Sequence, residues 1–146
     1  MAFWDTSALF KLYVRERDSD HFREMMRSSA AVPTISQLTL AEMHRALWAK
    51  EFARAIRTDR VEATYREFCD DVEVGMFGLI PFGRDVQYEF DRVVPICYRA
   101  TPPVPIRTLD GLLLASALLA RTLELVSTDA RMRTGGALLG LRVLPG

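Results

Sequence analysis

The feature that most constrains the fold of this chain is a repeated pairing of a short apolar run with a helix-start residue. The runs at residues 2–5, 31–36 and 123–127 are each followed by, or end on, a hydroxyl or carboxylate side chain. Such side chains cap helix N-termini. Short strands that alternate with helices in this way predict a parallel sheet covered by helices on both faces.

The same pattern continues along the whole chain without a linker or an internal repeat. We therefore expect one domain, residues 1–146, with an α/β fold of three layers (α/β/α) and a central, mainly parallel sheet of about four to five short strands. The predicted strands are 2–5, 31–36, 78–82, 123–127 and 141–144. The predicted helices are 7–14, 18–29, 38 to about 54–57, 59–75, 85 to about 95 where Pro95 ends or kinks it, 108–120 capped by Thr108, and a short one after Asp129.

Composition narrows the possible partners and the cellular compartment. The 19 basic and 19 acidic residues balance, so any binding to nucleic acid must be local rather than driven by overall charge. Nearly all the positive charge is arginine, with Lys11 and Lys50 as the only lysines. The longest apolar run, 112–120, is too short to cross a bilayer, and the charges in the first apolar stretch do not fit a signal peptide. The two cysteines match no zinc or redox spacing, and we expect a cytoplasmic protein with reduced thiols.

Four acidic residues are predicted to meet at one edge of the sheet. Asp5 ends the first strand, Asp129 follows the fourth, and Asp110 lies in the first turn of the helix before that strand. Glu42 lies one to two turns into the helix after the second strand. Ligands of open α/β sheets bind at the carboxyl ends of the strands, which is where these acids fall. Taken one at a time, the three aspartates are equally well explained as helix caps or partners of helix dipoles.

Glu42 is harder to explain as an ordinary structural residue. Leu38, Ala46 and Ala49 share its helical face, and a carboxylate buried in an apolar stripe without a partner is costly. A bound cation would relieve both that cost and the repulsion among the acids. Carboxylates without a histidine pair favour Mg²⁺ or Mn²⁺ over zinc. The predicted metal-binding and catalytic residues are Asp5, Glu42, Asp110 and Asp129.

The segments around these acids resemble a known family. Residues 4–13, 40–47, 109–117 and 125–129 resemble, in this order, the four acidic motifs of PIN-domain ribonucleases, especially the VapC-type toxins. The resemblance implies a Mg²⁺- or Mn²⁺-dependent endoribonuclease that hydrolyses RNA. It also implies a toxin that is held inactive by a cognate antitoxin protein and that forms a homodimer.

The resemblance also implies individual roles. Asp5 and Asp110 would be the central metal ligands, and Glu42 and Asp129 would complete the pocket. Ser7 and Ser127 are similar to groups that orient the acids, although Ser7 is equally explained as a helix cap. The chain departs from the family at Met132, where many relatives carry an aromatic residue, and the choice between one and two metal ions stays open.

Contacts to the substrate are less constrained. Arg131 and Arg133 closely follow the fourth acid and are candidates for binding RNA phosphate at the rim of the pocket. Lys50, Arg54 and Arg57 form a second candidate, a basic stripe on the long helix, but a run of charges on a helix is more often a solvated face.

Two alternatives to a toxin ribonuclease remain. One is a housekeeping or DNA-directed phosphodiesterase of the same fold, and another is a catalytically inactive binding module. A signalling receiver domain is disfavoured because no lysine follows Lys50. Phosphatases of the Asp-x-Asp type are disfavoured because Ser7 stands where they need a second acid.

Overall fold

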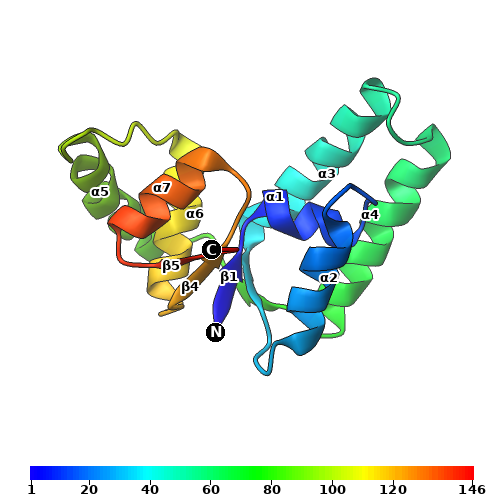
Figure 1. Cartoon of the computed structure of the whole chain (residues 1–146), viewed down its shortest axis with the longest axis horizontal. Coiled ribbons are helices and arrows are strands. Elements are labelled where there is room, and N and C mark those ends of the chain that lie inside the picture. Colours follow the sequence, from blue (N-terminus) through cyan, green and yellow to red (C-terminus); the bar gives the residue numbers. More distant parts are fainter.

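Five short strands form a single parallel sheet in the order β3-β2-β1-β4-β5. The computed structural model describes residues 1–146 (Figure 1). The parallel sheet expected from the sequence is confirmed, although each strand is only three residues long. The strands are β1 (Ala2–Trp4), β2 (Thr34–Ser36), β3 (Gly78–Ile80), β4 (Glu124–Val126) and β5 (Arg142–Leu144).

Helices cover both faces of this sheet and complete the three layers. In Figure 1 the helices of the N-terminal half lie on one side of the strands, and those of the C-terminal half lie on the other. The helices are α1 (Thr6–Leu9), which continues into the 3₁₀ turn η1 (Phe10–Leu12), α2 (Ser19–Ser28), α3 (Gln37–Phe52), α4 (Thr58–Glu73), α5 (Arg84–Tyr98), α6 (Thr108–Leu119) and α7 (Ala130–Leu138).

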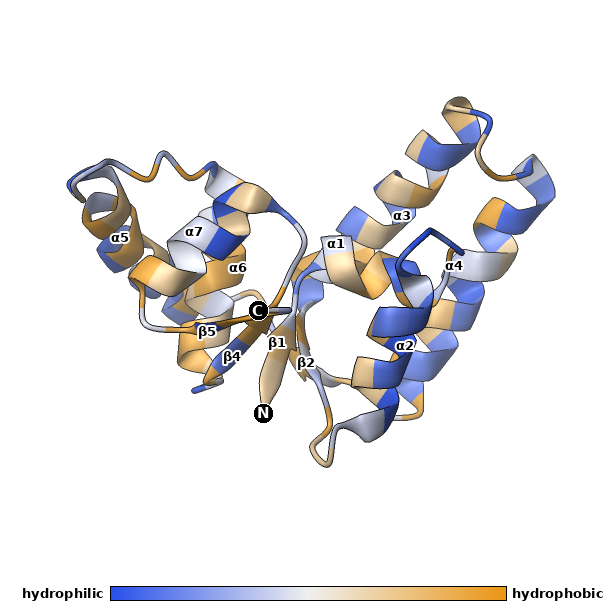
Figure 2. Ribbon diagram, viewed as in Figure 1, coloured by the Kyte–Doolittle hydropathy of each residue, from blue (hydrophilic) through white to orange (hydrophobic).

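The alternation of side chains along the strands divides the interior into two cores. Successive residues of a strand point to opposite faces of its sheet. Trp4 and Val126 therefore pack in the core under α1–α4, whereas their neighbours Phe3 and Leu125 pack in the core under α5–α7. Figure 2 shows the hydrophobic residues concentrated in the strands and on the helix faces turned toward them. No helix combines the length and the apolar character needed to span a membrane.

Two local expectations were wrong in detail. The helix predicted to end or kink near Pro95 continues to Tyr98, because Pro95 lies in the last turn, where a missing N–H removes only one helical hydrogen bond. Val93 and Cys97 of this helix are buried in the core under α5–α7. Thr108 does not cap α6 but is its first residue, and the cap position belongs to Arg107.

The contact between α7 and the sheet depends on a glycine. A Cβ atom at Gly136 would lie 2.5 Å from Cδ2 of Leu125, which is fully buried in β4. This close approach lets the C-terminal part of α7 pack directly against β4.

We predict that Gly136→Val lowers the free energy of unfolding by about 2–3 kcal/mol, because the branched side chain overpacks a core that cannot move aside. Denaturant unfolding followed by circular dichroism measures the change. Ala137→Val on the exposed side of the same helix controls for helix propensity. If both variants unfolded at the same denaturant concentration, the close packing at Gly136 would be refuted.

Candidate active site

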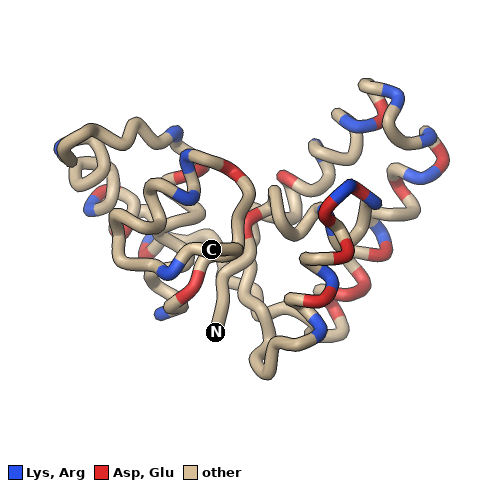
Figure 3. The backbone as a smooth tube through the Cα atoms, viewed as in Figure 1, with Lys and Arg blue, Asp and Glu red and all other residues tan.

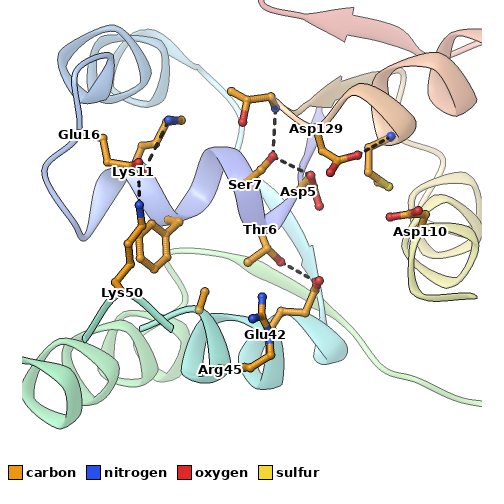
Figure 4. A pocket seen from close by; sticks show the side chains of 14 residues that line it. Asp5, Thr6, Ser7, Lys11, Glu16, Glu42, Arg45, Lys50, Asp110 and Asp129 are labelled. Atoms are coloured by element: carbon orange, nitrogen blue, oxygen red, sulfur yellow. Dashed lines mark hydrogen bonds and ion pairs between the residues drawn. The ribbon is translucent and has the colours of Figure 1, made fainter. Parts of the chain in front are cut away.

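A cavity of about 360 Å³ opens at the carboxyl edge of the sheet, and all four predicted acids line it (Figure 4). Asp5 follows β1, Glu42 comes from α3, Asp110 from α6 and Asp129 from the turn between β4 and α7. The topology therefore brings together acids that are up to 124 residues apart in sequence, since 129 − 5 = 124. Their catalytic role stays a prediction.

Asp5 is the most buried of the four acids, with an exposed fraction of 4%. Its backbone N–H donates to the carbonyl of Val126 at 2.9 Å, which extends the pairing of β1 with β4. Its Oδ2 accepts hydrogen bonds from the hydroxyls of Ser7 and Ser127, both at 2.8 Å. Burial raises the pKa of Asp5 above its ordinary value despite these bonds, and the nearby charge of Asp129 adds to the rise.

The two serines also position the chain after β4. Ser7 Oγ accepts a hydrogen bond from the backbone N–H of Thr128 at 3.0 Å, and Ser127 Oγ accepts one from the N–H of Asp129 at 3.0 Å. Ser7 makes no capping bond to its own helix. Both hydroxyls therefore contact the Asp5 carboxylate and fix the loop that carries Asp129, as expected of groups that orient the acids.

Asp129 and Asp110 each serve local structure with one oxygen and line the cavity as well. Asp129 Oδ1 accepts a hydrogen bond from Met132 N at 3.0 Å and caps α7. Asp110 Oδ2 accepts one from Arg107 N at 3.1 Å at the start of α6. The second oxygen of each carboxylate makes no hydrogen bond to protein. The capping explanation and the cavity position are therefore compatible.

Glu42 lies beside the buried stripe of α3 and not within it. The fully buried residues of that helix are Thr39, Met43 and Leu47, whereas Glu42 is half-buried and Ala49 is exposed. The apolar stripe expected around Glu42 is therefore corrected by one position on the helix.

Glu42 is nevertheless strongly perturbed. Its Oε1 accepts a hydrogen bond from Thr6 Oγ1 at 2.6 Å. Burial raises the pKa of Glu42 to about 7, with a further rise from the charges of Asp5 and Asp110. A carboxyl group that titrates near neutrality inside a cavity is typical of functional sites.

The cavity also contains a basic side that the search for acids did not find. Six charged or polar residues line it in addition to the four predicted acids and Ser7, namely Thr6, Lys11, Glu16, Arg45, Lys50 and Thr128. The only available signal in the sequence was that the chain has just two lysines. Elsewhere, acidic and basic residues are interspersed along α2 and α4 (Figure 3).

The basic stripe expected from Lys50, Arg54 and Arg57 does not form. Lys50 points into the cavity, whereas Arg54 and Arg57 lie in the turn between α3 and α4 and line a separate hollow. Arg57 pairs there with Asp59 at 3.0 Å. The chain turns at Arg54, which has a positive φ of 59°, so the helical spacing used in that expectation no longer applies.

Neither arginine expected at the rim lines the cavity. The guanidinium of Arg133 donates to the carbonyls of Ser127, Leu144 and Pro145 at 2.8, 3.1 and 2.7 Å, and so ties the ends of β4 and β5 together. The structure thus gives Arg133 a structural role, and the phosphate contact predicted for it stays a prediction. Arg131 is exposed beside the loop of Pro103–Pro105, and its contact with RNA stays a prediction.

Comparison with known proteins identifies the fold. No protein-family model and no curated protein matches this sequence significantly. Among solved structures, that of FitAB bound to an IR36 DNA fragment superimposes with a TM-score of 0.74 at 16% identity, over 99% of this chain and 94% of that one. The chain has a PIN-like fold.

Two further structures of this fold are similar over nearly their whole length. A toxin–antitoxin complex from Klebsiella pneumoniae matches with a TM-score of 0.63 at 17% identity, over 99% of this chain and 96% of that one. VapC20 from Mycobacterium tuberculosis, described as a sarcin-ricin loop cleaving toxin, matches with a TM-score of 0.67 at 14% identity, over 93% and 95%. The resemblance to PIN domains is thus confirmed at the level of the fold.

The carboxylates of this PIN-like cavity fit a hard cation that keeps part of its water shell better than a cation coordinated by protein groups on all sides. No three acidic, histidine or cysteine side chains are close enough together to ligate a single ion. Magnesium commonly keeps several waters and takes only one or two carboxylates. The free oxygens of Asp110 and Asp129, beside the hydrogen-bonded carboxylate of Asp5, supply this kind of donor set.

We predict that the metal-free protein loses stability as the pH rises from about 5 to about 8. Because the folded-state pKa of Glu42 lies above its ordinary value, its contribution is complete at low pH and is lost as the pH passes through about 7. After allowance for solvent screening, the loss is roughly 1–2 kcal/mol, or about 3–6 °C in Tm.

Thermal melts in EDTA at several pH values, on wild type and Glu42→Gln, measure this effect as a difference. The wild type should lose more Tm over the interval than Glu42→Gln, which has no carboxyl group to titrate. An identical pH dependence in the two proteins would contradict the raised pKa of Glu42.

Proposed function

We propose that this protein is a Mg²⁺- or Mn²⁺-dependent endoribonuclease that hydrolyses RNA phosphodiester bonds and acts as the toxin of a toxin–antitoxin pair. One observation carries the proposal: four acids from four distant segments line a single cavity at the carboxyl edge of the sheet, and one of them, Asp5, is almost fully buried. The PIN-like fold and neighbours described as toxins support it.

The chain's own residues divide the work in this proposal. Asp5 and Asp110 hold the cation, and Asp129 completes the pocket. When bound, the cation supplies charge for the developing negative oxygens and lowers the pKa of attacking water. Ser7 and Ser127 keep the Asp5 carboxylate in place. Glu42, which accepts a hydrogen bond from Thr6 and lines the same cavity, completes the pocket with Asp129 and is the proposed acceptor of a proton from water.

The proposed partners are RNA, a cognate antitoxin and a second copy of this chain. One protein of similar structure is described as a toxin–antitoxin complex, and two others are described as bound to DNA fragments. We carry over the antitoxin and, from the resemblance of the sequence motifs, the RNA substrate and the homodimer. Since both RNA and such an antitoxin are found in the cytoplasm, we place the activity there.

We predict that purified protein cleaves a mixed RNA pool with Mg²⁺ or Mn²⁺ and not with EDTA. Asp5→Asn and Asp110→Asn should each lower the cleavage rate by at least about 100-fold. Removing the charge of a ligand weakens binding of the cation and so reduces the positive charge that stabilises the transition state. Gel electrophoresis of end-labelled RNA measures the rates.

Asp91→Asn, an exposed acid on α5 outside the cavity, is the matched control and should cleave like wild type. Circular dichroism should show that all three variants are folded. Full activity of Asp5→Asn would refute the assigned site. Cleavage of single- or double-stranded DNA in preference to RNA would support a DNA-directed phosphodiesterase instead, and no cleavage by folded protein would favour a binding module.

We also predict that expression of the chain arrests growth of a bacterial host, and that Asp5→Asn does not. Co-expression of a short open reading frame next to its gene should restore growth and yield a complex on gel filtration. Cleavage in vitro without any growth arrest would favour a housekeeping nuclease over a toxin.

A further inference from the structure

Both lysines of the chain line the same cavity. The other 17 of the 19 basic residues are arginines, and they lie almost entirely elsewhere on the surface. Lys11 comes from η1 and Lys50 from the last turn of α3, which are 39 positions apart in sequence. Their meeting in a cavity of 14 lining residues therefore calls for a local explanation.

A single carboxylate holds the two ammonium groups together. Lys50 Nζ lies 3.3 Å from Glu16 Oε2, and Lys11 Nζ lies 3.6 Å from Glu16 Oε1. Lys11 also pairs with Asp18 at 2.8 Å. Each ammonium further lies over an aromatic ring, 5.9 Å from its centroid, with Lys11 above Phe22 and Lys50 above Phe10. The cations are thus held in place before any ligand arrives.

A purely structural role does not explain the choice of lysine. Apart from the contact of His44 with Glu62, every other ion pair in the protein uses arginine. The two lysines are partly buried in their pairs, with side-chain exposed fractions of 12% for Lys11 and 38% for Lys50, yet the attraction to Glu16 or Asp18 alone would be met equally well by an arginine. Lysine differs in being a compact point charge that binds phosphate from several directions. Its use only at this cavity indicates a ligand there.

The charges of the cavity change sign along two neighbouring segments. In the first segment Asp5 precedes Lys11, and on α3 Glu42 precedes Arg45 and Lys50. At ~1.5 Å rise per residue, Lys50 follows Glu42 by ~12 Å along the helix axis. Figure 4 shows Lys11, Lys50 and Glu16 at one end of the cavity and Asp110 and Asp129 at the other. Arg45, which lies between, has no ion pair.

We propose that Lys11, Lys50 and Arg45 form a subsite for a phosphate group next to the one that is cleaved, on the same nucleic acid strand. This inference rests on the proposed nuclease function and extends it to a substrate class: an oligonucleotide that continues past the scissile bond, rather than a mononucleotide ester. Glu16 is a positioning residue that keeps both ammonium groups at the cavity. The subsite also offsets the repulsion between a polyanion and the four acids, which the neutral overall charge cannot do.

The first test measures binding without cleavage. An unstructured RNA octamer is titrated by fluorescence anisotropy, at several salt concentrations, into the Asp5→Asn/Asp110→Asn protein. Adding Lys50→Gln, Lys11→Gln or Arg45→Gln should weaken binding by roughly three- to tenfold and reduce the slope of log K against log [salt] by about 0.7 per contact. Arg60→Gln removes an exposed charge from α4 outside the cavity and should change neither quantity.

The second test compares two substrates of the otherwise wild-type enzyme in Mn²⁺. Lys50→Gln should lower kcat/KM for the RNA octamer several times more than for bis(p-nitrophenyl) phosphate, which has one phosphodiester and no neighbouring phosphate. An equal fall on both substrates would overturn the subsite. Circular dichroism identifies any variant that fails to fold, and Lys50→Gln, in which the wild-type side chain is 38% exposed, is the variant best placed to fold normally.

The two hypotheses fail in different ways. If the octamer binds all lysine variants as tightly as their parent, the subsite is refuted whether or not the protein cleaves RNA. If binding depends on the lysines but wild type shows no metal-dependent cleavage, the proposed nuclease is refuted, and with it the link to a cleaved phosphate, whereas binding of a nucleic acid strand by these residues is established.

Discussion

The burial of one carboxylate, that of Asp5, is the constraint on which the arrangement of the site depends. A charge removed from water is costly unless hydrogen bonds replace its hydration. The hydroxyls of Ser7 and Ser127 supply these bonds from segments 120 positions apart. The same two hydroxyls accept hydrogen bonds from the backbone N–H groups of Thr128 and Asp129. The hydroxyls that bind the Asp5 carboxylate therefore also fix the loop that brings Asp129 to the cavity.

Two residues of α7 hold the helix that follows this loop in its place beside the sheet. Gly136 lets α7 approach Leu125 of β4, and Arg133 of the same helix binds three carbonyls at the ends of β4 and β5. Neither residue lines the cavity, yet both hold α7, the helix that Asp129 caps, in its place beside β4 and β5. Rigid elements of this kind keep functional groups in place better than a free loop does.

The cavity contains both a group of mutually repelling carboxylates and, next to it, a group of basic side chains. Burial raises the pKa values of Asp5 and Glu42, and the charges of neighbouring carboxylates raise them further. Without a cation, ionising these groups in the folded protein therefore lowers its stability. A few residues further along the same two segments, Lys11 and Lys50 are held by Glu16. A site with an acidic end and a basic end suits a divalent cation at one end and a phosphate group of a strand at the other, as the proposed function requires.

The sequence by itself determined the α/β layers and the edge at which the acids meet, because strand periodicity, helix caps and the geometry of parallel sheets are local or topological properties. Only the tertiary structure decided what surrounds those acids. Arg133 turned away to carbonyls of β4 and β5, and α3 presented Glu42 at the side of its buried stripe. Lys11 and Lys50 met across 39 positions of sequence through Glu16. Side-chain direction and contacts between distant segments depend on how helices pack on the sheet, and no local pattern in the chain encodes that packing.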